Sequence, residues 1–241
     1  MQCKAPFSLT KIDKFAFSGC SSLVEFLIPP SVTEIGDFCF KECSSLQQIS
    51  LPSTMTKINY STFMKCTSLK EITIPPSVNE IKKCAFAECT SLTKIEIPFL
   101  VTEIERKTFY NCTSLEYILI PESVNKFSPK AFENCSSLKE IKINEIELIP
   151  KVVFKNCTSL TNIVIPSSVK EIEQNAFSGC TLLNNIVIPS SVTVIKQNAF
   201  EKCTSLTNII IPSTITVLED NLFDGCNSLT NLEIPSSVTV I

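Results

Sequence analysis

Residues 199–218 read AFEKCTSLTNIIIPSTITVL, and close copies of this stretch fill the rest of the chain. Each copy carries a cysteine with Phe three residues before it and Leu three residues after it. This cysteine recurs every 23 residues, except for one step of 22 residues between the sixth and seventh copies. The ten ladder cysteines are Cys20, Cys43, Cys66, Cys89, Cys112, Cys135, Cys157, Cys180, Cys203 and Cys226. Self-similarity at a fixed period of this length indicates a repeat array.

Each unit contains two short extended segments. The pattern L-x-x-I-x-I places Ile209 and Ile211 on one side of an extended chain and Ile210 on the other. Pro212 follows and ends the strand, because proline lacks the N–H group that a strand ladder needs. A second short alternation, Val-Thr-x-Ile in many units, leads into the A-F-x-x-C segment of the next unit. That segment is too short for a full helix, so we expect a turn or a single helical turn.

A single unit cannot bury its own apolar residues, whereas a stack of units buries them in one column. Equivalent strands then pair in parallel, about 4.7–4.9 Å apart. The sequence therefore predicts an open, curved solenoid of about ten 23-residue repeats. The pattern covers residues 1–241 as a single domain and stops within a unit at both ends. Since solenoids need polar caps and none is visible, we expect either a longer array or end-to-end self-association.

The strand L-x-x-I-x-I-P, together with S-V-T-x-I and A-F-x-x-C-[ST]-S-L, resembles the BspA-like leucine-rich repeats of bacterial and protozoan surface proteins. The resemblance covers residues 5–241. It implies an α/β leucine-rich-repeat solenoid, mostly parallel β with short turns or single helical turns. The family usually has Gly after the last Ile of the unit, but here only Gly36 fills that site. Asn144 replaces Pro in the sixth unit, which is one residue short, so we expect a local kink or bulge between Asn144 and Val153.

Composition excludes several classes of function. The chain has no His, no Trp and only four Gly, so the commonest general base and metal ligand and any glycine-rich phosphate loop are missing. We therefore predict no catalytic residues, no cofactor and no metal site. There are 21 basic residues against 24 acidic ones, and Arg106 is the only arginine, which argues against a nucleic-acid partner. No apolar run is long enough to span a membrane, and the first ten residues lack the apolar core of a secretion signal.

The cysteines allow several interpretations, which are metal binding, redox chemistry, disulfides and plain core packing. Their spacing is the repeat period and lacks the clustering of a structural zinc site. We expect a column of buried free thiols that act as small hydrophobic side chains. Three further cysteines lie elsewhere in the unit: Cys39 at a core position, Cys84 at a variable and exposed position, and Cys3 at a strand position.

Four Asn-x-[Ser/Thr] triplets are candidate glycosylation sites, namely Asn59, Asn111, Asn134 and Asn156. The last three directly precede a ladder cysteine, at a position that holds Gly, Glu or Lys in other units. We therefore expect this position to face solvent. A repeat rich in Ser and Thr also generates such triplets by chance.

The strand positions that alternate with the core face outward and provide the candidate binding face. In the later units an asparagine column runs beside an aliphatic stripe. A contiguous apolar surface of this kind can mark a contact region. The same pattern would also arise if β-branched residues simply favour strands, or if asparagines bond to one another between coils. The candidate residues are Tyr117, Leu119, Asn162, Val164, Asn185, Val187, Asn208, Ile210 and Asn231.

These observations predict a non-catalytic module that recognises a protein or glycan ligand through its repeat surface. Members of the family that the chain resembles are typically adhesins or antigens that bind host matrix proteins or other microbes. The resemblance therefore implies a cell-surface or extracellular location and a role in adhesion. The alternative is a cytoplasmic scaffold for protein–protein interaction, which free cysteines and the absence of a signal peptide would also fit.

Overall fold

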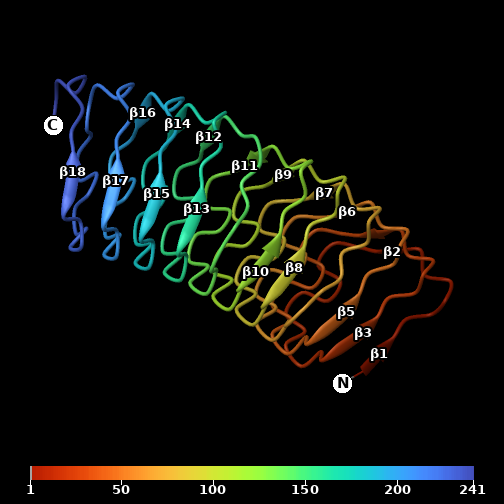
Figure 1. The fold of residues 1–241 in the computed structure, drawn as a ribbon. Coiled ribbons are helices and arrows are strands. Elements are labelled where there is room, and N and C mark those ends of the chain that lie inside the picture. The colour runs from red at the N-terminus through yellow and green to blue at the C-terminus, as the bar shows by residue number, and fades with distance from the viewer. Residues whose placement is uncertain (1) are drawn as a thin grey trace.

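The computed structural model describes residues 2–241, which wind into an open solenoid (Figure 1). Each coil is one repeat, and two rows of short strands run along it. The row of three-residue strands consists of β1 (Gln2–Lys4), β3 (Glu25–Leu27), β5 (Gln48–Ser50), β8 (Lys94–Glu96), β10 (Tyr117–Leu119), β13 (Asn162–Val164), β15 (Asn185–Val187), β17 (Asn208–Ile210) and β18 (Asn231–Glu233). The row of two-residue strands consists of β2 (Lys11–Ile12), β4 (Glu34–Ile35), β6 (Lys57–Ile58), β7 (Glu80–Ile81), β9 (Glu103–Ile104), β11 (Lys126–Phe127), β12 (Leu148–Ile149), β14 (Glu171–Ile172) and β16 (Val194–Ile195).

The strands pair in parallel between successive coils, with equivalent positions of the repeat opposite one another. Ile186 of β15, for example, pairs with Ile163 of β13 and with Ile209 of β17. In-register stacking follows from the constant period, because a shift by one residue would turn every apolar side chain of the strand outward. The predicted parallel solenoid is confirmed.

The described residues, 2–241, contain no helix, so the α/β class and the single helical turns that we expected are not confirmed. The segment before each ladder cysteine forms consecutive turns instead. The Cys112 N–H donates to the Phe109 carbonyl three residues earlier (3.1 Å), but the Phe109 N–H donates to Ala131 of the next coil (2.9 Å). Since alternate N–H groups bond to the next coil, the helical hydrogen-bond series cannot form. Residues 2–241 accordingly include no helix that could cross a membrane.

Positive φ angles occur at two positions of each turn segment, one and five residues before the ladder cysteine. In the fifth unit these are Asn111, with φ of 57°, and Lys107, with φ of 59°. Gly36, which follows the last Ile of its unit, lies at neither of these two positions, and its φ angle is not positive. A Cβ atom on Gly36 would overlap the backbone of Lys14 in the preceding coil, so the reason for glycine there is close approach.

Phenylalanine rings form the centre of the core. The Phe three residues before each ladder cysteine stacks on its equivalents in the neighbouring coils, with ring centroids 5.3 to 5.9 Å apart. Phe109 is fully buried between Phe86 and Phe132, at 5.7 and 5.6 Å. Leu, Ile and Val of the two strands surround this column, as the repeat pattern predicts.

The repeated hydroxyl residues link adjacent coils. The Ser191 hydroxyl donates to the Val169 carbonyl of the preceding coil (2.7 Å), and the Thr181 hydroxyl donates to the Thr158 carbonyl (3.2 Å). Equivalent bonds recur along the solenoid, which explains why the unit retains Ser or Thr after Pro and after Cys. These hydroxyl groups donate hydrogen bonds to backbone carbonyls that have no partner in the short strands.

The sixth unit interrupts the pairing of both strand rows. β11 pairs with β9 and β12 pairs with β14, but β11 and β12 do not pair with each other. Residues 140–142 form no strand, and only an isolated bridge joins Glu140 to Asn162. Asn144 donates its amide N–H groups to Pro121 and Val124 of the preceding coil, at 2.6 and 3.2 Å. The irregularity expected from the short unit coincides with this break in strand pairing. The two-residue row is also unpaired between β4 and β6 and between β7 and β9, where the units have the normal length.

Candidate recognition surface on the strand face

The outward side of the three-residue strands, which we call the strand face, carries the candidate residues. In β15 the central Ile186 is buried, whereas Asn185 and Val187 on either side of it are exposed. Val164, Val187 and Ile210 have exposed fractions of 79%, 64% and 65%. Aliphatic side chains in strands are seldom this exposed. Val164, Val187 and Ile210 therefore form an apolar patch on the surface.

Strands β13, β15, β17 and β18 form one sheet, and their register aligns the two predicted columns. One column consists of Asn162, Asn185, Asn208 and Asn231, and the other of Val164, Val187 and Ile210 followed by Glu233. Within the described residues the side chains of these four asparagines make no hydrogen bond. The alternative of an asparagine column bonded to itself therefore does not apply on the strand face, and the amides stay free for a partner.

A hollow of about 580 Å³ lies on the strand face where the sixth unit breaks the sheet. It spans three coils, and its deeper wall consists of buried Ile side chains of the same strands. The exposed side chains of this sixth-unit hollow are Tyr117, Leu119, Glu140, Lys142, Asn162 and Val164. Four of these six belong to the candidate face predicted from the sequence. The hollow itself was not predicted, although it lies at the 22-residue unit, where the sequence predicted an irregularity.

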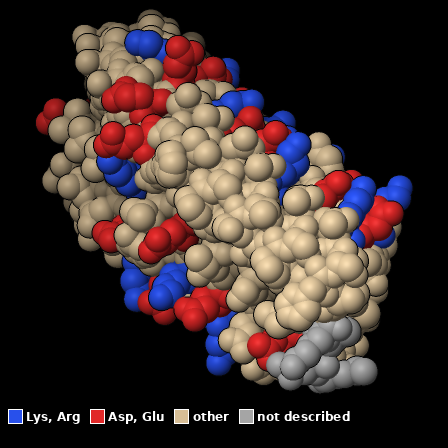
Figure 2. Space-filling view, turned by 90° about the vertical axis from the view of Figure 1, so that its right-hand side faces the viewer, with Lys and Arg blue, Asp and Glu red and all other residues tan. Residues whose placement is uncertain are grey.

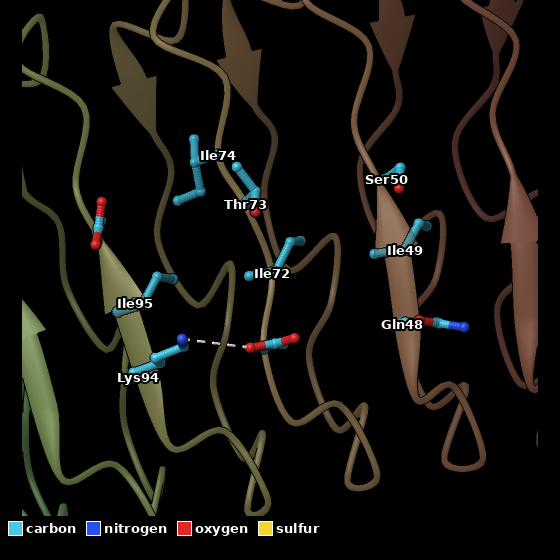
Figure 3. A pocket seen from close by; sticks show the side chains of 10 residues that line it. Gln48, Ile49, Ser50, Ile72, Thr73, Ile74, Lys94 and Ile95 are labelled. Atoms are coloured by element: carbon cyan, nitrogen blue, oxygen red, sulfur yellow. Dashed lines mark ion pairs between the residues drawn. The ribbon is translucent and has the colours of Figure 1, made fainter.

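A second hollow, of about 330 Å³, lies over the third unit, where residues 71–73 form no strand between β5 and β8 (Figure 3). Buried isoleucines form its floor, as in the sixth-unit hollow, but its exposed side chains are polar and come from three consecutive coils. The Glu71 carboxylate pairs with the Lys94 ammonium group at 3.6 Å, which the dashed line in Figure 3 marks. The exposed side chains of this third-unit hollow are Gln48, Ser50, Glu71, Thr73, Lys94 and Glu96. The third unit has the normal length, so nothing in the sequence indicated this hollow.

Charged side chains are distributed unevenly over the surface. Figure 2 shows Lys, Arg, Asp and Glu side chains gathered towards the edges of the view, with a broad uncharged area between them. On the two-residue strands, ion pairs join neighbouring coils, as between Lys57 and Glu80 at 3.2 Å. A hydrogen bond from Lys82 lowers the pKa of Glu80, and the same bond raises the pKa of Lys82. Exposed pairs of this kind add little stability each, so the charges mainly keep these edges hydrated.

Comparison with known proteins identifies the family. The sequence model of the BspA type Leucine rich repeat region (6 copies) matches residues 2–115, 56–181 and 147–241. The chain belongs to the BspA-type leucine-rich repeat family. The predicted resemblance is thus confirmed over nearly the whole sequence. No match occurs among the curated proteins.

Solved structures of repeat proteins from bacteria share this solenoid fold. A leucine rich cell surface protein from Faecalibacterium prausnitzii is 27% identical, with a TM-score of 0.70 over 100% of this chain and 77% of that one. The pneumococcal vaccine antigen PcpA is 21% identical, with a TM-score of 0.62 over 96% of this chain and 65% of that one. A leucine-rich repeat protein from Eubacterium ventriosum is 20% identical, with a TM-score of 0.53 over 96% and 84%. The last two likenesses show the fold alone.

The triplet asparagines of this BspA-type chain are bonded to neighbouring coils. The Asn134 amide donates to the Asn111 side-chain oxygen (2.6 Å), and the Asn156 amide donates to that of Asn134 (2.8 Å). The Asn59 amide donates to the Ile35 carbonyl (2.7 Å). A glycan would be attached to this same amide nitrogen, which keeps one N–H after attachment; at Asn111 that nitrogen donates no hydrogen bond within the described residues. Glycosylation of the four sites remains a prediction.

The ladder cysteines form a second column beside the phenylalanines of the BspA-type repeat. Eight of the ten are buried, whereas Cys20 is exposed and Cys226 is partly exposed. The Cys112 S–H group donates to the Phe86 carbonyl of the preceding coil at 3.1 Å, and the other ladder cysteines from Cys43 onward do the same with the equivalent carbonyl. Cysteine therefore suits the site because it is small, apolar and still able to donate one hydrogen bond.

No disulfide joins the twelve cysteines whose side chains the structure describes; the side chain of Cys3 lies outside that part. Cys39 is buried, as its core position predicts, and Cys84 is partly exposed. Burial raises the pKa of Cys112 to about 12, and it also raises the pKa of the other buried thiols. Within the described residues no three His, Cys, Asp or Glu side chains cluster in a way that could hold a metal ion.

Thiol alkylation at neutral pH should separate the two kinds of cysteine. We expect iodoacetamide to label Cys20 and Cys84 in the folded protein, and to label Cys112 about a thousandfold more slowly, because a pKa raised to about 12 removes nearly all thiolate. Mass-spectrometric peptide mapping after timed quenching measures each site. In denaturant without reductant, all twelve described cysteines should react. Labelling of Cys112 in the folded protein at the rate of Cys20 would contradict the buried column.

Proposed function

We propose that the chain is a non-catalytic recognition module that binds a protein partner through the strand face. The observation that carries the proposal is the apolar row of Val164, Val187 and Ile210, with free asparagine amides beside it. Leu119 lies in the same column on the other side of the sixth-unit hollow, with Lys142 between it and Val164. Extended surfaces of this kind are the usual binding surfaces of repeat proteins. The lack of His in the sequence supports a role without catalysis.

The chemistry of the strand face suits a protein ligand. Covering the aliphatic row would remove apolar surface from water, worth roughly 25 cal/mol for each Å² buried. The amides of Asn162, Asn185 and Asn208 can donate and accept hydrogen bonds along the same row. Apolar anchors beside adaptable polar groups are typical of protein interfaces.

The proposed setting is a microbial cell surface, where the module would adhere to a host matrix protein or to another cell. Membership of the BspA-type family supports this setting. The Faecalibacterium prausnitzii protein, 27% identical over the full length of this chain, is described as a cell surface protein. Protease and antibody accessibility on intact, unpermeabilised cells of the source tests the location.

Charge placed in the aliphatic row should prevent binding. We expect the double variant Val187→Lys/Ile210→Lys to lose at least about tenfold in affinity for immobilised matrix proteins that bind the wild type, because two ammonium groups would be buried unpaired at the interface. Surface plasmon resonance measures the affinity, and urea unfolding checks the fold. Val217→Lys is the matched control, since Val217 is also exposed (41%) but lies outside the strand face. Equal affinity of the double variant and the wild type would contradict the proposal.

An intracellular scaffold is the second candidate, and the free thiols favour it. All twelve described cysteines are unpaired, as is usual in a reducing compartment. The accessibility experiment separates the two settings. Labelling of intact cells supports the surface module, whereas protection until lysis supports the scaffold and makes the Asn-x-[Ser/Thr] triplets accidental.

A further inference from the structure

We propose that the sixth-unit hollow receives a lysine or arginine side chain of the protein partner. This inference rests on the proposed function and names the chemistry of the partner at its central contact. Three features of the hollow support it: its apolar wall, a carboxylate without an ion partner, and the contrast with the third-unit hollow.

The wall of the sixth-unit hollow suits the aliphatic stem of a basic side chain. Tyr117 and Leu119 lie on one side with exposed fractions of 45% and 47%, and Val164 lies on the other. Lysine and arginine bury their methylene stems along such surfaces while the charged end finds a polar partner. An aromatic ring such as Tyr117 also attracts a cation placed over its face.

Glu140 supplies the negative charge of the hollow. It is exposed and bridges to Asn162 of the next coil by backbone pairing, so its side chain lies in the column that also contains Tyr117 of the preceding coil. Within the described residues no lysine or arginine pairs with it. Lys142 binds Glu122 at 3.4 Å, and Lys139 binds Glu116 at 2.6 Å. Both nearby lysines thus have other partners, and the carboxylate of Glu140 stays available.

The third-unit hollow shows how the same position is neutralised within the chain. Glu71 there corresponds to Glu140, and the next coil offers Lys94, which pairs with Glu71 at 3.6 Å. In the sixth-unit hollow the residue at the position of Lys94 is the neutral Asn162. The column of Glu140 thus lacks the cation that Lys94 supplies to Glu71. The lysine of the sixth-unit hollow, Lys142, lies in the other column and pairs with Glu122, so a cation from a partner would complete the Glu140 site.

A metal ion is a less suitable occupant than a basic side chain. Calcium or magnesium needs several oxygen ligands, and the described residues hold no cluster of three acidic groups around Glu140. The apolar wall formed by Tyr117, Leu119 and Val164 would not bind a hydrated ion.

Glu96 provides a matched control for Glu140. It is also an exposed carboxylate of a hollow on the strand face, and it has no ion pair within the described residues. Its neighbours in the same column are Thr73 of the preceding coil and Leu119 of the next coil. Glu96 therefore lies next to Leu119 but does not line the sixth-unit hollow, whereas Glu140 does. A general effect of surface charge would act on both carboxylates, and contact within the hollow would act on Glu140 alone.

Two short peptides test the proposal by NMR titration of the full chain with labelled methyl groups. The probes are acetyl-Gly-Gly-Arg-Gly-Gly-amide and the same peptide with citrulline in place of arginine, which keeps the shape and removes the charge. We expect the arginine peptide to shift the Leu119 and Val164 methyl signals saturably at millimolar concentration. The affinity should fall at least about fivefold with citrulline, with Glu140→Gln, or on raising the salt concentration tenfold, and should not change with Glu96→Gln.

Equal affinity of the two peptides, an unchanged affinity of Glu140→Gln, or no shift with either peptide would each overturn the inference. Methyl spectra of the free variants establish that the fold is intact. The proposed function is judged separately, by partner binding of Val187→Lys/Ile210→Lys. Loss of partner binding in that variant together with equal peptide affinities would retain the strand face and reject the basic side chain.

Discussion

Raising the pH from 7 to about 10 should unfold the chain cooperatively. Nine thiols are buried in the folded state, and burial raises the pKa of each, to about 12 for Cys39, Cys43 and Cys112. The other six are Cys66, Cys89, Cys135, Cys157, Cys180 and Cys203. In the unfolded chain the same thiols lose their protons near pH 8.5 to 9.

The direction in which stability changes with pH follows from the number of protons that each state binds. Above about pH 9 the folded chain holds more protons than the unfolded chain, so the free energy of unfolding falls as the pH rises. The stabilisation by the buried, protonated thiols is complete below the pKa of the thiols in the unfolded chain. It decreases as the pH rises from there to about 12. At pH 10 each buried thiol costs about 1.4–2 kcal/mol. Nine such thiols together cost about 13–18 kcal/mol, which is as large as the roughly 5–15 kcal/mol by which a domain is usually stable.

Urea unfolding at pH 7, 8, 9 and 9.5, in the presence of a phosphine reductant, measures this dependence. Between pH 9 and 9.5, Cys112→Ala should reduce the slope of unfolding free energy against pH by about 1 kcal/mol per pH unit, the share of one partly ionised thiol. Val124→Ala is the control, because it also truncates a fully buried side chain but removes no titrating group. Equal stability at pH 7 and pH 9.5 would show that the thiols are not buried as described.

Replacement of Phe109 by alanine should cost about 3–5 kcal/mol of unfolding free energy, the usual loss for a large core aromatic. The ring is fully buried and stacks on Phe86 and Phe132, so its removal leaves a cavity and ends two ring contacts. Because each coil contacts only its neighbours, the variant should weaken two successive interfaces, one with the preceding coil and one with the next coil. Urea unfolding followed by circular dichroism measures both the midpoint and the cooperativity.

Phe99→Ser is the matched control for this variant. Phe99 is 64% exposed and follows a proline, at a position where units such as the second and the seventh have serine, at Ser53 and Ser167. Its replacement should change the stability by no more than about 0.5 kcal/mol. A similar cost for both variants would mean that the Phe109 ring does not stack in a core column.

The register of the strand face could be read directly from the repeat. A constant 23-residue period places Val164, Val187 and Ile210 at equivalent positions, and the alternation with buried isoleucines turns them outward. Every coil meets the same neighbours, so the local pattern and the tertiary contacts select the same arrangement. The stacked phenylalanines and the buried thiols follow for the same reason.

The turn segments could not be predicted to the same degree. Their form depends on hydrogen bonds to the next coil, such as that from Phe109 to Ala131, and local propensity contains no information about them. A single unit with the sequence A-F-x-x-C could form either a helical turn or a turn whose N–H groups bond to the next coil. The bonds between Asn111, Asn134 and Asn156 likewise exist only because stacking brings the side chains into contact.

The sequence by itself thus determined the solenoid, its parallel register and the residues of the exposed row, because these depend on periodicity alone. Only the tertiary structure decided where the sheet opens into hollows and which charges find partners. The repeat places Lys94 beside Glu71 and Asn162 beside Glu140. The structure adds that Lys139 and Lys142 pair with Glu116 and Glu122, which leaves Glu140 without a cation within the described residues. The physical reason is that an ion pair requires two side chains from different coils to approach within about 4 Å. Only the stacking of the coils brings the two side chains to that distance.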